Sequence, residues 1–217
     1  MKNKQDDFKL QLANMDLGAL RNAIQPFSEL LMRYDCAIGE VKTKIENLDM
    51  ELSITHKRNP VESIKTRLKK PLSIIEKLDR LGKERTIENI DECIRDVAGV
   101  RVICTFIDDI YLMTKYLTEQ DDIKLLEIKD YIKYPKPNGY RSLHLLIEVP
   151  VFLSTGKIPT TVEIQIRTVA MDFWASLEHK IRYKKDITDK DIANDRLKAC
   201  ADIIFDLDVE MQSINTY

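Results

Sequence analysis

Long apolar runs are missing from this sequence. No stretch of about 18 apolar residues occurs, which excludes a typical transmembrane helix, and the start MKNKQDDFKLQLAN lacks the apolar segment of a secretory signal. Cysteine is also sparse, because the four cysteines lie far apart and without CxxC spacing. They predict reduced, mostly buried thiols rather than a disulfide framework. We therefore expect a soluble, cytoplasmic protein that does not associate with membranes.

Common motifs of metal and nucleotide enzymes are absent as well. The sequence contains no HExxH, CxxC or GxGxxG motif, and it offers no histidine–aspartate pair for a metal-dependent hydrolase. The segment STGKIPT is not a P-loop, because Val151 stands where the first glycine belongs and Ile158 where serine or threonine should follow. Any phosphate chemistry must therefore use another kind of site.

The residues that are present suit a folded domain with two basic regions. Of the 217 residues, 44% are hydrophobic, which suffices for one large domain or a domain with helical extensions. The net charge is -2, yet lysine and arginine gather at 57–85 and 129–141. Balanced charge with clustered cations favours a small anionic ligand over a long nucleic acid, which requires an overall basic face.

Apolar residues at helical spacing mark both ends of the chain. Steps of three and four define an N-terminal seam, formed by Leu31, Tyr34, Ile38, Val41, Ile45, Leu48 and Leu52. The same steps define a C-terminal seam, formed by Leu197, Cys200, Ile204, Leu207, Met211 and Ile214. We expect a long helix at each end, with a helix start or a break at Pro26. Each seam packs on the chain's own domain, on the other seam, or across a symmetric subunit interface.

A basic surface is predicted between residues 61 and 82. Residues 61–70 alternate between apolar and polar, which indicates a strand with one basic face that carries Lys65, Arg67 and Lys69. A helix should follow, from Pro71 to about Gly82. One side of that helix carries Ser73, Lys77 and Arg80. A merely solvated charged face is the simpler alternative, but strand and helix direct their cations to one neighbourhood.

The remaining segments predict an α/β (α+β) fold. Besides 61–70, the expected strands are VRVICTF, DIKLLEIKDYI, SLHLLIEV and TVEIQIRT, and the segments between and after them include the helices DDIYLMTKYL and VAMDFWASLEHKIRY and the loop KYPKPNGYR. We expect a mixed β-sheet of about five strands flanked by helices. The short connection between the last two strands predicts that they pair antiparallel.

One face of the last expected strand is polar. In TVEIQIRT the apolar residues point one way and leave the other side to Glu163, Gln165 and Arg167. Charged groups on a central strand are costly without partners, so this face indicates the floor of a site.

Asp96 and Glu163 are the candidate metal or acid–base carboxylates. Phosphoryl chemistry with Mg²⁺ uses one or two carboxylates together with substrate phosphate oxygens. The competing interpretation is structural, in which these acids pair with Arg95, Arg101 or Arg167. Spacing alone does not decide between the two.

The loop before SLHLLIEV offers an aromatic and two cations. Tyr140 follows Asn138 and Gly139, so its ring could stack on a purine while Lys136 and His144 reach phosphates. An Asn-Gly turn beside an aromatic residue is commonly just a turn, and a lone histidine is commonly a buried one. Both interpretations stay open from the residues alone.

Four motifs in order carry a resemblance to a known family. YPKPNGYRSLH and EIQIRT, with DVAGVR upstream and WASLEHK downstream, resemble the synthetase domain of RelA/SpoT-type alarmone enzymes. The resemblance runs from about residue 60 to 183. The short chain, without a hydrolase domain before it or regulatory domains after it, is similar to the stand-alone small alarmone synthetases, particularly the RelP type.

This resemblance implies an activity and an architecture. It implies transfer of the β,γ-pyrophosphate of ATP to the 3′-hydroxyl of GTP or GDP with Mg²⁺, which gives (p)ppGpp and AMP. It also implies a nucleotidyltransferase-like sheet and a homotetramer held by terminal helices. The expected organisation is an N-terminal helical extension at 1–59, a catalytic domain at 60–184 and a C-terminal oligomerisation helix at 185–217.

The resemblance assigns roles to individual residues. Asp96 corresponds to the Mg²⁺-binding aspartate, and Glu163 to the glutamate that activates the 3′-hydroxyl or shares the metal. The expected ATP-binding residues are Arg67 and Arg101 around the adenine, and Lys77 and Arg80 at the phosphates with Ser73 beside them. The expected GTP- or GDP-binding residues are Tyr140 against the guanine, Lys136 and His144 at the phosphates, and Lys129, Asn138 and Gln165.

Two other functions compete with synthesis. One is a catalytically inactive nucleotide- or RNA-binding regulator with the same fold, although a pure binder has no need of both carboxylates. The other is an alarmone hydrolase, which lacks its histidine–aspartate metal set here.

Overall fold

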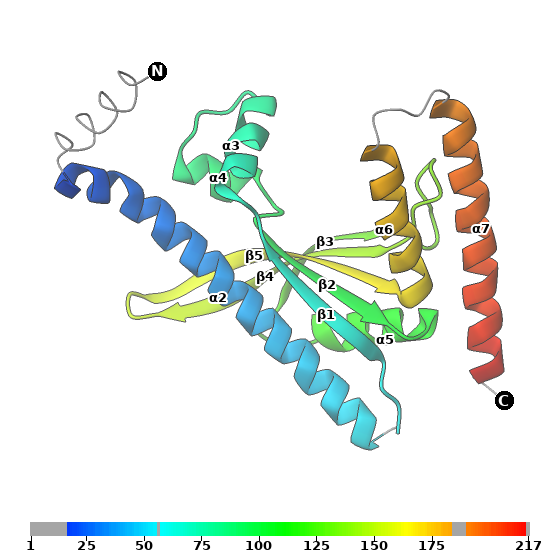
Figure 1. Ribbon diagram of the computed structural model, residues 1–217. Coiled ribbons are helices and arrows are strands. Elements are labelled where there is room, and N and C mark those ends of the chain that lie inside the picture. Colours follow the sequence, from blue (N-terminus) through cyan, green and yellow to red (C-terminus); the bar gives the residue numbers. More distant parts are fainter. Residues whose placement is uncertain (1–16, 56, 184–189, 216–217) are drawn as a thin grey trace, which may run out of the picture.

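The computed structural model describes residues 17–55, 57–183 and 190–215, in which a five-stranded sheet is flanked by helices (Figure 1). The elements in chain order are α2 (Leu17–Thr55), β1 (Val61–Leu68), α3 (Pro71–Arg80), α4 (Ile87–Cys93), β2 (Ala98–Cys104), α5 (Ile107–Thr118), β3 (Lys124–Asp130), β4 (Leu143–Leu153), β5 (Gly156–Thr168), α6 (Val169–Tyr183) and α7 (Lys190–Asn215). The predicted mixed α+β architecture is confirmed.

The strand order is β1-β2-β5-β4-β3. β2 and β5 are parallel, whereas β1 with β2, β4 with β5 and β3 with β4 are antiparallel. The predicted antiparallel pairing of β4 and β5 is therefore confirmed. Both strands are longer than expected: Val151 continues the buried apolar face of β4 beyond its predicted end at Val149, and β5 begins at Gly156 instead of Thr161. A turn at Ser154 and Thr155 then closes the hairpin.

The N-terminal seam packs on the sheet of its own chain. α2 contacts β1, β2, β4 and β5, and α5 packs beside it on β2 and β5. Tyr34, Val41 and Ile45 are at most 2% exposed within this core. The helix start or break expected at Pro26 is wrong, since α2 continues through this residue. Phe27 and Leu30, directly after the proline, pack into the core, and such burial offsets the local loss of one helical hydrogen bond.

The C-terminal seam has a different environment. α7 packs against α6 and α5 and lies away from α2 (Figure 1), so pairing of the two seams within one chain is wrong. Ala201 and Asp208 form the inward side of α7. The predicted seam instead faces largely outward, because Leu207 and Met211 are more than half exposed. The expected domain boundary at 184 lies outside the described residues.

The four cysteines differ in their exposure. All four cysteines are free thiols, but the prediction that they are mostly buried is wrong: Cys104 is buried, Cys36 and Cys93 are partly exposed, and Cys200 is exposed. Among the described residues, no helix is long and apolar enough to cross a membrane.

Candidate active site

Strand register gathers polar residues on the sheet face opposite α2. Directly paired positions form a row across all five strands, made of Lys65, Arg101, Gln165, His144 and Lys129. A second row, two residues along each strand and therefore on the same face, consists of Arg67, Gly99, Glu163, Leu146 and Glu127. Residues from five separate segments thus share one surface.

Gly99 leaves a gap in the second row between Arg67 and Glu163. An added Cβ would meet only the Arg67 carbonyl oxygen, at 3.5 Å, so the backbone tolerates it. A larger side chain here would instead extend into a cavity that Gly99 helps to line. The missing side chain therefore keeps space open between the arginine and the glutamate.

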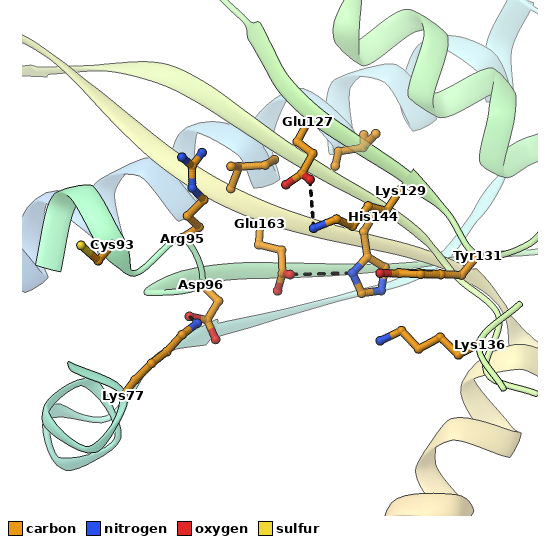
Figure 2. A pocket seen from close by; sticks show the side chains of 12 residues that line it. Lys77, Cys93, Arg95, Asp96, Glu127, Lys129, Tyr131, Lys136, His144 and Glu163 are labelled. Atoms are coloured by element: carbon orange, nitrogen blue, oxygen red, sulfur yellow. Dashed lines mark hydrogen bonds and ion pairs between the residues drawn. The ribbon is translucent and has the colours of Figure 1, made fainter. Parts of the chain in front are cut away.

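Two adjoining cavities open on this face and share Asp96 and Glu163. The first, about 390 Å³, is shown in Figure 2 and is also lined by Lys77, Arg95, Lys129, Tyr131, Lys136 and His144. The second, about 260 Å³, is also lined by Lys65, Arg67, Gly99, Arg101 and Gln165. The two candidate carboxylates therefore stand at the junction between an aromatic, basic cavity and an arginine-lined one.

Asp96 is held by two lysines from neighbouring elements. Lys69, directly after β1, donates to Oδ2 at 2.7 Å, and Lys77 of α3 donates to Oδ1 at 2.6 Å. Burial raises the pKa of Asp96, but these two charged hydrogen bonds outweigh it and hold the pKa below its ordinary value. Asp96 is therefore ionised at neutral pH, and the basic strand and helix do converge on one point.

Glu163 lies on β5 beside His144 of β4. His144 Nδ1 is 3.7 Å from Glu163 Oε1, and Gln165 Nε2 donates to Oε2 at 3.1 Å. Proximity to His144 holds the pKa of Glu163 below its ordinary value, against the opposing effect of burial. The carboxylate is thus charged at neutral pH and available to a metal ion or a hydroxyl.

Tyr131 and His144 line the first cavity, and Tyr140 contacts both of them without lining it. The Tyr140 hydroxyl lies 2.8 Å from His144 Nε2, and the rings of Tyr131 and His144 meet edge to face at 5.2 Å. Lys136 Nζ lies 4.6 Å from the Tyr131 ring centroid and 4.9 Å from that of Tyr140. A ring and an ammonium group in this arrangement suit a base and a phosphate of one nucleotide.

A run of hydrogen bonds favours one tautomer of His144. Arg167 can only donate, and its Nη2 donates to the Tyr140 hydroxyl oxygen at 2.5 Å. The Tyr140 hydroxyl can then donate to Nε2 of a neutral His144, which leaves Nδ1 protonated. The protonated nitrogen is the one that faces Glu163.

Most predicted site residues meet at these two cavities, but some do not. Four of them, Ser73, Arg80, Asn138 and Tyr140, line neither cavity, and Lys77, expected on the ATP side, lines the first. Asn138 donates to Glu178 at 3.1 Å and accepts from the Tyr140 amide, which shapes the loop. Gln165, expected on the acceptor side, lines the second cavity with the arginines. Lys129 pairs with Glu127 at 3.0 Å, and this contact raises its pKa.

A known protein family matches the part of the chain that carries the candidate site. A family described as a region found in RelA / SpoT proteins matches residues 66–188, which is more than half of the chain. The chain belongs to the RelA/SpoT family. The matched region contains both carboxylates, both cavities' central strands and the Tyr140 loop.

Relatives within the RelA/SpoT family cover nearly the whole chain. The GTP pyrophosphokinase YwaC of Bacillus subtilis is 44% identical over 94% of this chain and 97% of the relative. The crystal structure of small alarmone synthetase 2 from the same species has a TM-score of 0.76, with 44% identity over 86% of this chain and 97% of its own. Small alarmone synthetase 1, solved with its product pppGpp, has a TM-score of 0.79, with 32% identity over 88% of this chain and 97% of its own.

The RelA/SpoT site of this chain fits Mg²⁺ as a shared rather than a caged ion. Among the described residues, no group of three or more His, Cys, Asp or Glu could hold a metal. Mg²⁺ commonly keeps several waters and binds through one or two carboxylates plus substrate phosphates. Asp96 and Glu163 are close enough that the charge of Asp96 opposes the lowering of the Glu163 pKa. Together they can supply the protein's part of such a site.

Sequence reasoning missed three residues of this RelA/SpoT site. The strand pattern places Lys69 on a basic face but does not identify Asp96 as its partner. Tyr131 lies seven residues after Lys124, at the end of an expected strand, and nothing in its spacing marks it as a wall of the cavity. Arg167 was visible on the polar face of β5, but its contact with Tyr140 joins residues 27 positions apart.

Proposed function

We propose that this protein is a GTP pyrophosphokinase that transfers the β,γ-diphosphate of ATP to the 3′-hydroxyl of GTP or GDP, giving (p)ppGpp and AMP, in the cytoplasm. The observation that carries the proposal is the position of Asp96 and Glu163 at the junction of two adjoining cavities lined by cations. A transferase of this kind must hold two nucleotides with their reacting groups side by side. Two related proteins from Bacillus subtilis are named GTP pyrophosphokinases.

The second cavity is the proposed ATP site. Arg67 and Arg101 lie on adjacent strands, and planar guanidinium groups can stack on an adenine while they remain charged. Lys77 lines the first cavity, but it binds Asp96, which lines both cavities, so Lys77 and Lys69 could exchange Asp96 for phosphate oxygens of an ATP that reaches this junction. Arg80 and Ser73 stay predictions for this site, because they belong to the same helix as Lys77.

The first cavity is the proposed GTP or GDP site. Lys136, His144 and Lys129 line it and would supply cations for the phosphates. Tyr140, whose ring centroid lies 4.9 Å from Lys136 Nζ, is the proposed ring for the guanine. Asn138 and Gln165 orient these residues through their hydrogen bonds to the Tyr140 amide and to Glu163. The cavity is lined by both acidic and basic side chains. It therefore suits a small polyanion that binds together with a cation.

Catalysis then depends on position and charge rather than on a covalent intermediate. Glu163, ionised beside His144, would accept the proton of the 3′-hydroxyl or share the metal ion with Asp96. Lysines and arginines neutralise the charge that develops on the transferred phosphates. Bound Mg²⁺ would neutralise phosphate charge and lower the barrier for in-line attack.

A direct assay tests the proposal. The full-length protein is incubated with γ-labelled ATP, GTP and Mg²⁺, and the products are separated by chromatography. We expect a labelled guanosine pentaphosphate and stoichiometric AMP, and EDTA should stop both. Release of labelled phosphate or ADP without pentaphosphate would contradict the proposed reaction.

The inactive-regulator hypothesis is not favoured by the site. A protein that only binds nucleotide or RNA has no use for two ionised carboxylates at a cavity junction, where they repel phosphates. Filter binding with RNA, together with the transfer assay, distinguishes the two functions.

We also propose that the protein assembles as a homotetramer through its terminal helices. The outward side of α7 carries Ile203, Leu207, Met211 and Ile214, each at least 53% exposed. An apolar stripe of this length on one helix supports a subunit contact.

A further inference from the structure

Arg167 is a buried arginine, and each nitrogen of its guanidinium donates a hydrogen bond within the protein. Its residue is 4% exposed, and it lies on β5 next to the active-site face. Nη2 donates to the Tyr140 hydroxyl at 2.5 Å and to Gln165 Oε1 at 2.8 Å, and Nε donates to Ser142 Oγ at 3.3 Å. The guanidinium carbon also lies 5.0 Å from the Tyr140 ring centroid. The same guanidinium therefore contacts both the hydroxyl and the ring of Tyr140.

Asp172 pairs with Arg167 and also with two residues that line the second cavity. The residue is 8% exposed in the first turn of α6. Its Oδ1 accepts from Arg167 Nη1 at 3.3 Å and from Arg101 Nη1 at 3.3 Å, while Oδ2 accepts from Lys65 Nζ at 3.1 Å. Arg101 and Lys65 line the second cavity. One carboxylate thus connects both halves of the site.

Two arginines compete for the same oxygen atom of Asp172. Arg101 and Arg167 share Asp172 Oδ1 at equal distances. If Arg101 turns toward an adenine, one cation leaves Asp172, and its remaining negative charge is directed at Arg167 and Lys65. In a poorly solvated site the attraction between Asp172 and Arg167 then increases. Arg167, which holds Tyr140, then becomes more rigid.

We propose that Arg167 and Asp172 are positioning residues that hold Tyr140 for the acceptor nucleotide and couple acceptor binding to donor binding. The inference rests on the proposed function, because it takes Arg101 to contact the donor and Tyr140 the acceptor. Neither Arg167 nor Asp172 needs to touch a nucleotide. By thermodynamic linkage, if the bound donor increases the affinity for the acceptor, the bound acceptor increases the affinity for the donor by the same factor.

The first test separates acceptor from donor in the steady state. Arg167→Lys keeps the charge but loses the forked donor geometry, so the KM for GTP should rise about tenfold while the KM for ATP changes less than about twofold. The matched control is Arg58→Lys, since Arg58 pairs at 2.7 Å with the fully buried Asp109 at a distance from the cavities. We expect this control to alter the melting temperature without changing either KM.

A double-mutant cycle tests whether Arg167 acts through Tyr140. Tyr140→Phe removes the hydroxyl that Arg167 contacts and keeps the ring. The combined variant should raise the GTP KM by clearly less than the product of the two single effects. Full multiplicativity would show that Arg167 acts independently of Tyr140 and would overturn the inference.

The coupling itself is measured by calorimetry with Asp172→Asn. GDP is titrated into wild type and variant, with and without a non-hydrolysable ATP analogue and Mg²⁺. The analogue should increase GDP affinity about fivefold in wild type and less than about twofold in the variant. Equal enhancement in both proteins would contradict the coupling. A wild type that binds GDP but makes no pentaphosphate would refute the proposed function, while these titrations would still decide the inference.

Discussion

At the scale of single residues, the two active-site carboxylates differ in their neighbours. Asp96 is bound by two lysine ammonium groups, whereas Glu163 has a histidine and an amide beside it. If the two lysines move to bind phosphates, Asp96 becomes free to bind a metal ion. Asp96 therefore suits the role of metal ligand. Glu163 is the group that can take a proton without first losing two charged hydrogen bonds.

Replacement of the base should abolish turnover without unfolding the protein. Glu163→Gln keeps the shape of the side chain but removes its negative charge, so we expect kcat to fall by about a thousandfold or more. The melting temperature should change little, because Glu163 is partly exposed at the cavity. The control is Glu148→Gln, which interrupts a surface pair with Lys124 on the neighbouring strands and should leave turnover intact. Near-normal activity of the first variant would remove Glu163 from catalysis.

Gly139 is needed where the Tyr140 loop meets α7. Its φ is +88°, and an added Cβ would lie 2.6 Å from the Cβ of Ala201 and 3.2 Å from the Cα of Lys198. Gly139→Ala should therefore lower the free energy of unfolding by about 1–3 kcal/mol and raise the KM for GTP, because loop and helix must separate.

The matched control lies in the middle of α2. A Cβ at Gly39 meets nothing within 4 Å, and the residue is exposed. Gly39→Ala should stabilise the protein by about 0.5–1 kcal/mol through helix propensity. Urea denaturation of both variants measures the difference, and equal effects would contradict the proposed steric origin.

At the scale of elements, α7 supports the active-site loop as well as carrying an exposed stripe. Asp202 accepts from Arg141 at 3.1 Å, and the Arg141 guanidinium stacks 4.1 Å from the Phe205 ring centroid. On α6, Trp174 donates to the Leu197 carbonyl at 2.9 Å. The helix therefore fixes the residue next to Tyr140, and a disturbance of α7 should reach the acceptor site.

Asp208 should make the docking of α7 dependent on pH. Burial raises its pKa, despite a hydrogen bond from Thr168 that lowers it. The folded protein thus holds this proton more tightly than the unfolded chain, and the contribution of Asp208 to stability falls as pH rises from about 4 through the raised pKa. Asp208→Asn should increase the free energy of unfolding at pH 7, and the gain should disappear near pH 4.

Denaturation at several pH values checks this prediction. The control is Asp206→Asn, an exposed aspartate on the same helix, which should give no such trend. A gain that is independent of pH would show that the raised pKa of Asp208 is not its cause.

At the scale of the whole molecule, the sheet has one structural and one functional face. α2 and α5 cover the first with the main core, and the second carries the polar rows and both cavities. The outward stripe of α7 belongs to neither face. The surfaces proposed for catalysis and for assembly are therefore different.

Charge on the outer stripe of α7 should change assembly. Leu207→Glu combined with Met211→Glu places two carboxylates on exposed positions, so the fold should persist while a tetramer dissociates. Size-exclusion chromatography with light scattering measures the mass of both proteins. Exchange of the exposed Asp206 for Lys is a control for charge alone. A wild-type monomer at micromolar concentration would contradict the tetramer.

Local sequence patterns predicted the antiparallel hairpin of β4 and β5 and the types of most elements, although not the helix α4. Period and turn residues report on local backbone, and the motifs around Asp96, Tyr140 and Glu163 lie in the region that the family match covers. Tertiary structure alone decided which side of α7 is buried, that Lys69 binds Asp96, and that Arg167 and Asp172 join Tyr140 to Arg101. The reason is physical: a periodic pattern identifies a face but not its partner, and partners are set by strand register and helix packing between distant segments.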